Sequence, residues 1–290
     1  MNKRQLANIK IEHQRICNIQ VLGLFVLCAI ALFLFGCGID RNIKKGEKFL
    51  AIGEYYDAAT QFKTAYQRTP AKDRTQRGQL ATKMAFCYDQ ISASQRAIAA
   101  YRNVIRYKQD NKDTHLKLAA NLMKTGAYPE AIKEYSIALD SMPDNDIARE
   151  GLAAATKAPT IKEQGSYYHV KKMDKFNSRK QDYSPMLFGD QYNQLYFTST
   201  RNEAQGDEIS GITGVKPGDI FVSEKDEKGK WGIPHAIESG LNSEADEGTP
   251  SFSVDGREMY ITQCLTDPTY PRFAQIAVSS RADAAWGKPK

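Results

Sequence analysis

The sequence is poor in the residues from which metal and redox sites are most often built. Among its 290 residues there are only five cysteines and four histidines. The histidines are scattered along the chain, and no cluster of histidines and cysteines has the spacing of a zinc site. We therefore expect neither a metal site nor a bound cofactor.

Motifs of hydrolases and nucleotide-binding enzymes are also missing. No Gly-x-Ser-x-Gly occurs, because Ser210 lacks the first glycine of that nucleophile motif. Gly206 and Gly211 have the glycine spacing of a phosphate-binding loop, but Ile212-Thr213 follows where that loop needs a lysine and a hydroxyl. There is no His-Glu-x-x-His. We expect no catalytic residues and a protein that is not an enzyme.

The excess of positive over negative side chains is small. The chain has 40 lysines and arginines against 34 aspartates and glutamates, a formal net charge of +6. Residues 1–36 contribute four of the bases and one acid, so the remainder is close to +3. So weak an excess over so long a chain argues against nucleic acid as a partner.

One long apolar run stands out, from Val21 to Phe35, and it follows a segment with four bases. Its fifteen residues are too few to cross a hydrocarbon core of about 30 Å comfortably. A basic segment, a short apolar run and a small residue before the cleavage point are typical of a secretory signal. We expect residues 1–36 to be a signal peptide; the alternative is an uncleaved membrane anchor.

The end of this run, Leu34-Phe35-Gly36-Cys37, resembles a bacterial lipobox. The resemblance implies that Cys37 is diacylated and becomes the first residue of a mature lipoprotein. Gly38 does not introduce the aspartate that retains lipoproteins at the inner membrane. We therefore expect a lipid anchor in the outer membrane and a chain that faces the periplasm. Cys87 and Cys264, the cysteines left after Cys37, are expected to be buried small apolar residues.

Residues 39–145 repeat a helix–turn–helix pattern with a period near 34. The matching residues are Gly46, Gly53, Tyr55, Ala58, Phe62, Ala65 and Pro70, then Ala85, Ser92, Ser94, Ala97, Tyr101 and Val104, then Ala119, Gly126, Tyr128, Ala131, Tyr135, Ala138 and Pro143. Small residues allow the two helices of a pair to approach, and the aromatic residues fill the space between neighbouring pairs. The copies resemble tetratricopeptide (TPR) repeats, which stack as an α-solenoid.

We expect this TPR helical domain to span residues 37–157, with a cap helix over 146–157 and a linker over 158–165. A TPR stack presents a concave groove lined by the first helix of each pair. The groove positions fall on Glu47, Phe86, Asp89, Gln90, Met123 and Lys124. They predict a docking surface for a peptide or protein; the alternative is a spacer whose groove is solvated or covered.

After residue 165 the apolar period changes from 3.6 to 2, and a second repeat of about 65 residues begins. Asn177 to Pro185 and Asn242 to Pro250 have equal spacing. Turn dipeptides precede the alternating runs Gln194–Ser199 and Glu258–Gln263, and two later segments also match in both copies. The first copy has extra residues around 202–216, which we expect to form a loop.

The motif S/T-P-x-F-S-x-D-G-x-x-x-Y around Thr249 to Tyr260 resembles the PD40, or WD40-like, repeats of exported proteins. The resemblance implies a β-propeller over residues 166–290. A propeller closes with about four to eight blades. We count the end of one blade (166–176), a full blade and a second blade, so we expect a partial propeller from a longer protein. The alternative is that a partner or second copy completes the ring.

This order of signal, TPR helices and PD40-like strands resembles the N-terminal part of PorE-like lipoproteins of the type IX secretion system. In that family an OmpA-like domain follows the propeller. The resemblance implies a non-enzymatic scaffold that faces the periplasm, with other envelope and secretion-complex proteins as partners. Binding of peptidoglycan would belong to the OmpA-like domain, which residues 37–290 do not contain.

Two other functions remain open from the sequence. The chain could be a lipoprotein that binds a substrate or wall fragment at the propeller mouth. It could instead be an accessory domain of a longer hydrolase. The scaffold is the function that the repeats favour most.

Overall fold

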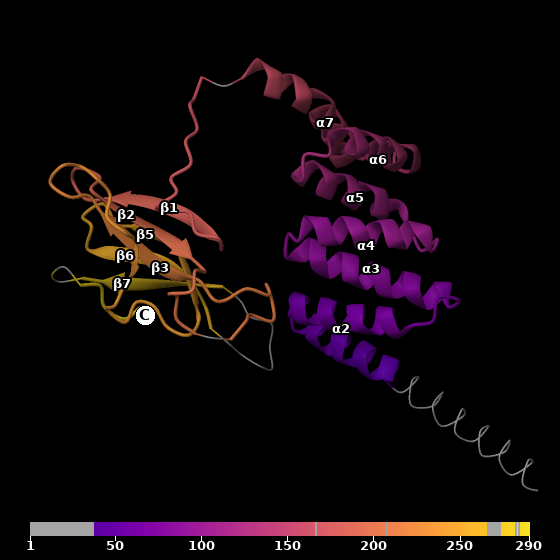
Figure 1. Cartoon of the computed structure of the whole chain (residues 1–290), viewed down its shortest axis with the longest axis horizontal. Helices are drawn as coiled ribbons and strands as arrows, with labels where there is room; N and C mark the ends of the chain where they lie inside the picture. The colour runs from indigo at the N-terminus through magenta and orange to yellow at the C-terminus, as the bar shows by residue number, and fades with distance from the viewer. Residues whose placement is uncertain (1–37, 166, 207, 266–273, 282, 284) are drawn as a thin grey trace, which may run out of the picture.

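The computed structural model describes residues 38–290 except 166, 207, 266–273, 282 and 284. Helices come first and antiparallel strands follow (Figure 1). The expected signal peptide, the lipobox-like sequence and Cys37 lie outside the described residues. Within the described part of the chain, no helix is both long and apolar enough to cross a membrane.

Among the described residues, seven helical segments are stacked in chain order, each packed on the next (Figure 1). They are residues 38–51, α2 (Tyr55–Arg68), α3 (Arg74–Gln90), α4 (Ser94–Arg106), α5 (Lys112–Lys124), α6 (Tyr128–Ser141) and α7 (Asp146–Gln164). The first six form three helix–turn–helix pairs. The predicted helical repeat is therefore confirmed.

The turns inside the pairs explain the glycines of the repeat. Gly53 and Gly126 have φ angles of +79° and +74°, in the left-handed region that glycine adopts without strain. Ser92 takes the same place in the second pair with φ of +54°. The turn thus keeps its geometry without glycine, at a cost of about 1 kcal/mol for a residue with a side chain.

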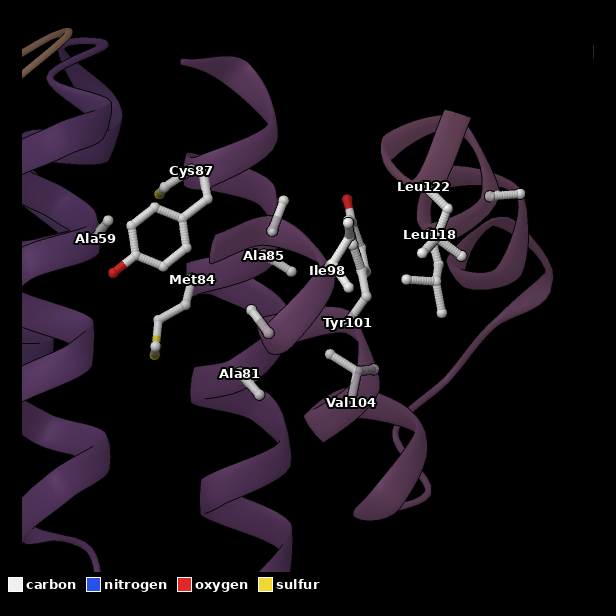
Figure 2. Packing of buried hydrophobic residues seen from close by; sticks show 14 of the residues in the cluster. Ala59, Ala81, Met84, Ala85, Cys87, Ile98, Tyr101, Val104, Leu118 and Leu122 are labelled. Atoms are coloured by element: carbon white, nitrogen blue, oxygen red, sulfur yellow. The ribbon is translucent and has the colours of Figure 1, made fainter. Parts of the chain in front are cut away.

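Small residues bring neighbouring helices together as predicted. A β-carbon on Gly46 would lie 2.6 Å from the ring of Phe62, and one on Gly151 would lie 2.4 Å from the ring of Tyr135. Figure 2 shows Tyr101 of α4 directed toward Leu118 and Leu122 of α5. All belong to one buried cluster that runs through the helical part. The aromatic residues therefore join one pair to the next, because a single pair cannot bury its own apolar face.

The expected linker over residues 158–165 is wrong for all but its last residue. Helix α7 continues through Pro159 to Gln164 and ends at Gly165, which has φ of +72°. Asn145 caps its start by accepting a hydrogen bond from the amide of Ala148 at 2.8 Å. Pro159 removes one intrahelical hydrogen bond, but the alanine-rich turns before it tolerate the loss.

Two antiparallel sheets make up the C-terminal part. The first contains β1 (Asp182–Phe188), β2 (Gln194–Ser199), β3 (Asp219–Glu224) and β4 (His235–Ala236), in that order. The second contains β5 (Asp246–Phe252), β6 (Glu258–Cys264) and β7 (Gln275–Ser280). The strands predicted from the alternating runs at 194–199 and 258–263 are thus confirmed.

The Ser/Thr-Pro element of the repeat forms a β-bulge in both sheets. The register shifts between Tyr183 and Met186 in the first sheet, and between Gly248 and Ser251 in the second. Ser184 and Thr249, each directly before a proline, have φ angles of +52° and +50°. The proline cannot donate to the strand ladder, so the bulge is where it fits.

The described residues form two sheets and no closed ring, so the propeller is not shown. Residues 166–176 were expected to be the end of a blade. Of these, residues 167–176 are described, and they contain no strand. Instead the amide of Phe176 donates to the carbonyl of Met173, and the Phe176 ring packs edge-on against Phe197. Cys87 is buried as expected, but Cys264 is only half-buried.

Candidate protein-interaction surfaces

The first helices of the three pairs present side chains that meet on one side of the stack. We call this surface the first-helix face, and it consists of Glu47, Lys83, Phe86, Asp89, Lys117 and Lys124. Glu47 and Lys83 form an ion pair between segment 38–51 and α3. Contacts between α3 and α5 continue the face across the next pair.

Phe86 is the apolar centre of this face. Its side chain is 37% exposed although it lies in the middle of the stack. The ring of Tyr55 packs edge-on against it at a centroid distance of 6.1 Å. The ammonium group of Lys117 lies 5.7 Å from the ring centroid, within the range of a cation–π interaction. An exposed aromatic ring beside a cation can receive an apolar residue together with an acidic group.

Asp89 is the polar centre of the same face. It accepts a hydrogen bond from the side-chain nitrogen of Asn121 at 2.8 Å, and the Lys124 ammonium lies 3.9 Å from the same oxygen. Burial, followed by the nearby Asp89 charge, raises the pKa of Tyr101. Asp89 is thus fixed by its neighbours and orients Lys124 at the edge of the face.

Only some of the predicted groove residues lie together on the first-helix face. The structure brings Phe86, Asp89 and Lys124 together, and Glu47 lies next to them through Lys83. Gln90 is exposed at the end of α3. Met123 is partly buried and packs against the helical core, so it supports the face from below.

Sequence reasoning missed Lys83, Lys117 and Asn121. Their importance comes from contacts between one pair and the next, whereas the groove positions were taken from the TPR resemblance. Lys117 forms no ion pair with any carboxylate of the described residues. Its charge is therefore available to a partner.

The inserted loop between β2 and β3 touches the helical part. The backbone amides of Tyr56 and Asp57 donate to the carbonyls of Ile212 and Gly211, both at 3.1 Å. These amides belong to the first turn of α2, where a helix leaves its N–H groups without intrahelical partners. The side chain of Glu54 does not cap this helix, so the loop supplies the cap.

Gly214 lets this loop approach closely. Its φ angle is +74°, and a β-carbon there would lie 2.0 Å from the ring of Tyr56. The loop predicted from the extra residues 202–216 thus lies between two strands, as expected, and also joins the sheets to the first helix pair.

A second concave region lies in the sheet part, where the β1–β2 and β5–β6 turns meet. The cavity has a volume of about 850 Å³, and its lining includes Phe188, Phe252, Asp190, Asp255 and Arg281. The guanidinium of Arg281 lies 4.7 Å from the ring centroid of Phe188. Aromatic rings beside a cation and two carboxylates could hold a small polar ligand.

Buried carboxylates in the sheets serve the fold. Asp182 accepts hydrogen bonds from Ser178 and Ser199, and Glu247 at the matching place accepts them from Ser243 and Gln263. No group of histidine, cysteine, aspartate and glutamate side chains among the described residues has the arrangement of a metal site.

The buried thiol of Cys87 does not have the properties of a nucleophile. Burial raises the pKa of Cys87 to about 12, so the thiolate is scarce at neutral pH. The side chain lies inside the helical core (Figure 2). It acts as a small apolar residue.

Helix pairs of this length, joined by left-handed turns and packed through small residues, have the geometry of tetratricopeptide repeats. The helical part has a TPR-like fold. No protein-family model matches the chain, and no curated protein matches it.

Several solved structures are similar to the TPR-like part. A structure of MamA AMB-1 is 19% identical, with a TM-score of 0.38, over 43% of this chain and 66% of that one. The first TPR domain of Spaghetti (RPAP3), bound to an HSP90 peptide, is 18% identical over 43% of this chain and 94% of that one, with a TM-score of 0.35. The Sgt2 TPR domain from Aspergillus fumigatus is 15% identical over 47% and 88%, with a TM-score of 0.35.

Proposed function

We propose that this chain is a non-enzymatic scaffold that binds a segment of a partner protein on its first-helix face. The observation that carries the proposal is the exposed ring of Phe86 between Tyr55 and the ammonium of Lys117. Aromatic residues at the centre of a surface, with a cation beside them, are typical of the residues that contribute most to protein–protein binding.

The chemistry of the face indicates the kind of segment that would bind. Phe86 offers an apolar contact, whereas Lys117 beside its ring and Lys124 beside Asp89 offer positive charge. Because Lys124 is 3.9 Å from Asp89, a partner carboxylate would compete with a weak ion pair only. The favoured segment therefore carries an apolar side chain close to an acidic group.

We propose further that the scaffold works in a bacterial envelope assembly, facing the periplasm from the outer membrane. The support is the apolar run Val21–Phe35 and the lipobox-like sequence that ends at Cys37. The resemblance of the whole chain to PorE-like lipoproteins makes the type IX secretion system the first assembly to test.

The cavity between the sheet turns favours a second candidate, a lipoprotein that binds a small ligand. Its volume of about 850 Å³ and the pairing of Arg281 with Phe188 would suit a sugar or peptide fragment. This function and the scaffold use different surfaces, so they can be tested separately.

Affinity purification of the tagged chain from a bacterial host that encodes it tests the scaffold. We expect envelope proteins to co-purify with the unaltered chain and to be lost when Phe86→Ala and Lys117→Glu are combined. Arg102→Ala, on the exposed surface of α4, is the control and should retain them. Recovery of the same proteins with the double variant, or of small ligands alone, would end the scaffold hypothesis.

Cell fractionation tests the anchor independently. With Cys37→Ala, we expect the chain to move from the membrane fraction to the soluble fraction, because the acyl acceptor is gone. Unchanged fractionation would contradict lipidation at Cys37.

A further inference from the structure

Four arginines gather along one edge of the helical stack, at two successive turns between helix pairs. We call this set the basic edge, and it consists of Arg68, Arg74, Arg77 and Arg106, which lie at the turns from α2 to α3 and from α4 to α5. None of the four forms an ion pair with a carboxylate of the described residues. Asp73, the acidic residue beside them in the sequence, instead caps α3 by accepting a hydrogen bond from the amide of Gln76 at 3.0 Å.

Direct contacts hold these arginines close to one another. Arg74 donates a hydrogen bond to the carbonyl of Arg106 at 2.9 Å, which joins the two turns. Arg77 donates to the hydroxyl of Tyr107 at 3.2 Å, and the guanidinium of Arg74 lies 5.6 Å from the centroid of the same ring. A hydrogen bond with Tyr66 and the one from Arg77 lower the pKa of Tyr107. Cations this close repel one another, and an anion bound along the edge would offset that repulsion.

The basic edge begins beside the residue that follows the expected anchor. A β-carbon on Gly38 would lie 3.3 Å from an Nη atom of Arg68, and Gly38 directly follows Cys37 in the sequence. Arg68 ends α2, and the carbonyl of the next residue, Thr69, accepts a hydrogen bond from Arg77 at 3.0 Å. The edge therefore runs without interruption from residue 38 to the second turn.

The far end of the same edge has the opposite charge. The third turn between helix segments, from α6 to α7, carries the exposed side chains of Asp140, Asp144 and Asp146. Arg149 lies beside them and forms an ion pair with Asp146. The edge thus changes from basic next to residue 38 to acidic at the other end of the stack.

We propose, on the basis of the anchor proposed at Cys37, that the basic edge lies against the anionic headgroups of the membrane that holds this anchor. Guanidinium groups suit this partner, because they form paired hydrogen bonds with phosphate oxygens. A basic surface beside a lipid anchor adds electrostatic attraction to anionic lipids. Repulsion of the acidic third turn would direct the far end of the stack away from the membrane. An anionic membrane is favoured over an acidic protein because the edge begins next to Cys37.

Vesicle binding tests this contact in the absence of the anchor. The chain without residues 1–36, carrying Cys37→Ser, contains every residue that the structure describes and lacks the apolar run, which would itself enter a bilayer. Its co-sedimentation is measured with vesicles of phosphatidylcholine, and with vesicles of phosphatidylcholine and phosphatidylglycerol in equal parts. We expect binding only to the vesicles that contain phosphatidylglycerol, and weaker binding as the salt concentration rises.

Charge reversal locates the surface that binds. Arg68→Glu, Arg74→Glu and Arg106→Glu, all at exposed positions, should together weaken the apparent affinity for the anionic vesicles at least about tenfold. The matched control makes the same change in net charge at three exposed lysines away from the edge, as Lys133→Glu, Lys157→Glu and Lys228→Glu. The control variant should keep the affinity of the unaltered chain, and circular dichroism checks that both variants are folded.

Several outcomes would overturn the proposed contact. They are equal binding to both kinds of vesicle, an equal loss of affinity in both variants, and release from the vesicles by inorganic phosphate at the phosphate concentration of the lipid. Loss of a co-purifying protein from the edge variant, with vesicle binding unchanged, would assign the edge to an acidic protein instead. Failure of the anchor is seen separately, as unchanged fractionation of the Cys37→Ala chain. Failure of the first-helix face is also separate, since Phe86→Ala with Lys117→Glu leaves the basic edge intact.

Discussion

Arg201 donates a hydrogen bond to Asp182 at 2.8 Å. Glu247 takes the place of Asp182 in the second sheet, where Leu265 stands in place of Arg201, and it forms no ion pair with an arginine of the described residues. The Arg201–Asp182 pair is nearly buried, with side-chain exposures of 12% and 10%. The guanidinium also covers the rings of Phe197 and Phe221. This ion pair thus holds the guanidinium of Arg201 over the side of the first sheet that carries Phe197 and Phe221.

This pair predicts a loss of stability in acid. Burial opposes ionisation of Asp182, but hydrogen bonds from Ser199, Arg201 and Ser178 outweigh it and hold its pKa below the ordinary value. A lowered pKa stabilises the fold above the unfolded pKa, and this contribution disappears as the pH falls below about 4. Asp182→Asn should lower the free energy of unfolding by at least about 2 kcal/mol at pH 7, and by less at pH 3. Chemical denaturation at both pH values measures the difference; an equal effect at both would contradict it.

Asp219 should behave in the opposite way. Burial, and next the charge of Glu247, raise the pKa of Asp219 to about 6 despite a hydrogen bond from the amide of Gln205. Its other oxygen is buried without a partner among the described residues. The folded protein therefore favours the neutral form of Asp219 more than the unfolded chain does. As a result, the free energy of unfolding should decrease as the pH rises from about 4 to about 6.

Asp219→Asn removes this dependence, because the amide stays neutral. We expect the variant to be more stable than the unaltered chain by about 1–2 kcal/mol at pH 7.5, and nearly equal to it at pH 4. The same denaturation series measures both aspartates. A variant that is less stable at pH 7.5 would show that the buried carboxylate is ionised at no cost.

The contact between the inserted loop and α2 gives another prediction. Gly214→Ala should displace the loop, since its β-carbon would collide with the ring of Tyr56. Amide hydrogen exchange at Tyr56 and Asp57 should then accelerate at least about tenfold. Gly229→Ala is the control, because Gly229 has a similar φ of +76° but no atom within 4 Å of the added carbon. Equal exchange in both variants would mean that the loop does not cap α2.

A fourth prediction concerns the close packing of the third helix pair. Ala131 is fully buried, so Ala131→Arg forces a long charged side chain into a helix contact. We expect a loss of more than about 3 kcal/mol in the free energy of unfolding. Ala99→Arg on the exposed side of α4 should change it by less than about 0.5 kcal/mol. An unaltered melting temperature for Ala131→Arg would contradict the packing.

Much of the helical fold could be predicted because its rules are local. Gly53 and Gly126 mark left-handed turns, and small residues mark close helix contacts. The end of α7 could not be found in the same way. A linker was expected from residue 158 onward, whereas Gly165 is the residue with a positive φ angle that ends the helix.

The candidate site was predicted only in part, for a physical reason. Phe86 and Asp89 on α3 and Lys124 on α5 were expected from the groove positions of TPR helix pairs, and the structure places them on one face. The contact of Lys117 with Phe86 depends on the offset between successive pairs, which no local pattern encodes. The same holds for the loop carbonyls of Gly211 and Ile212 at the start of α2.

The most direct test of the scaffold is photo-crosslinking in cells from a benzophenone amino acid in place of Phe86, against the same group in place of Arg102 on α4. We predict one discrete protein adduct from position 86, absent from position 102 and lost when Lys117→Glu is added. No adduct from position 86, or the same adduct from both positions, would contradict binding on the first-helix face.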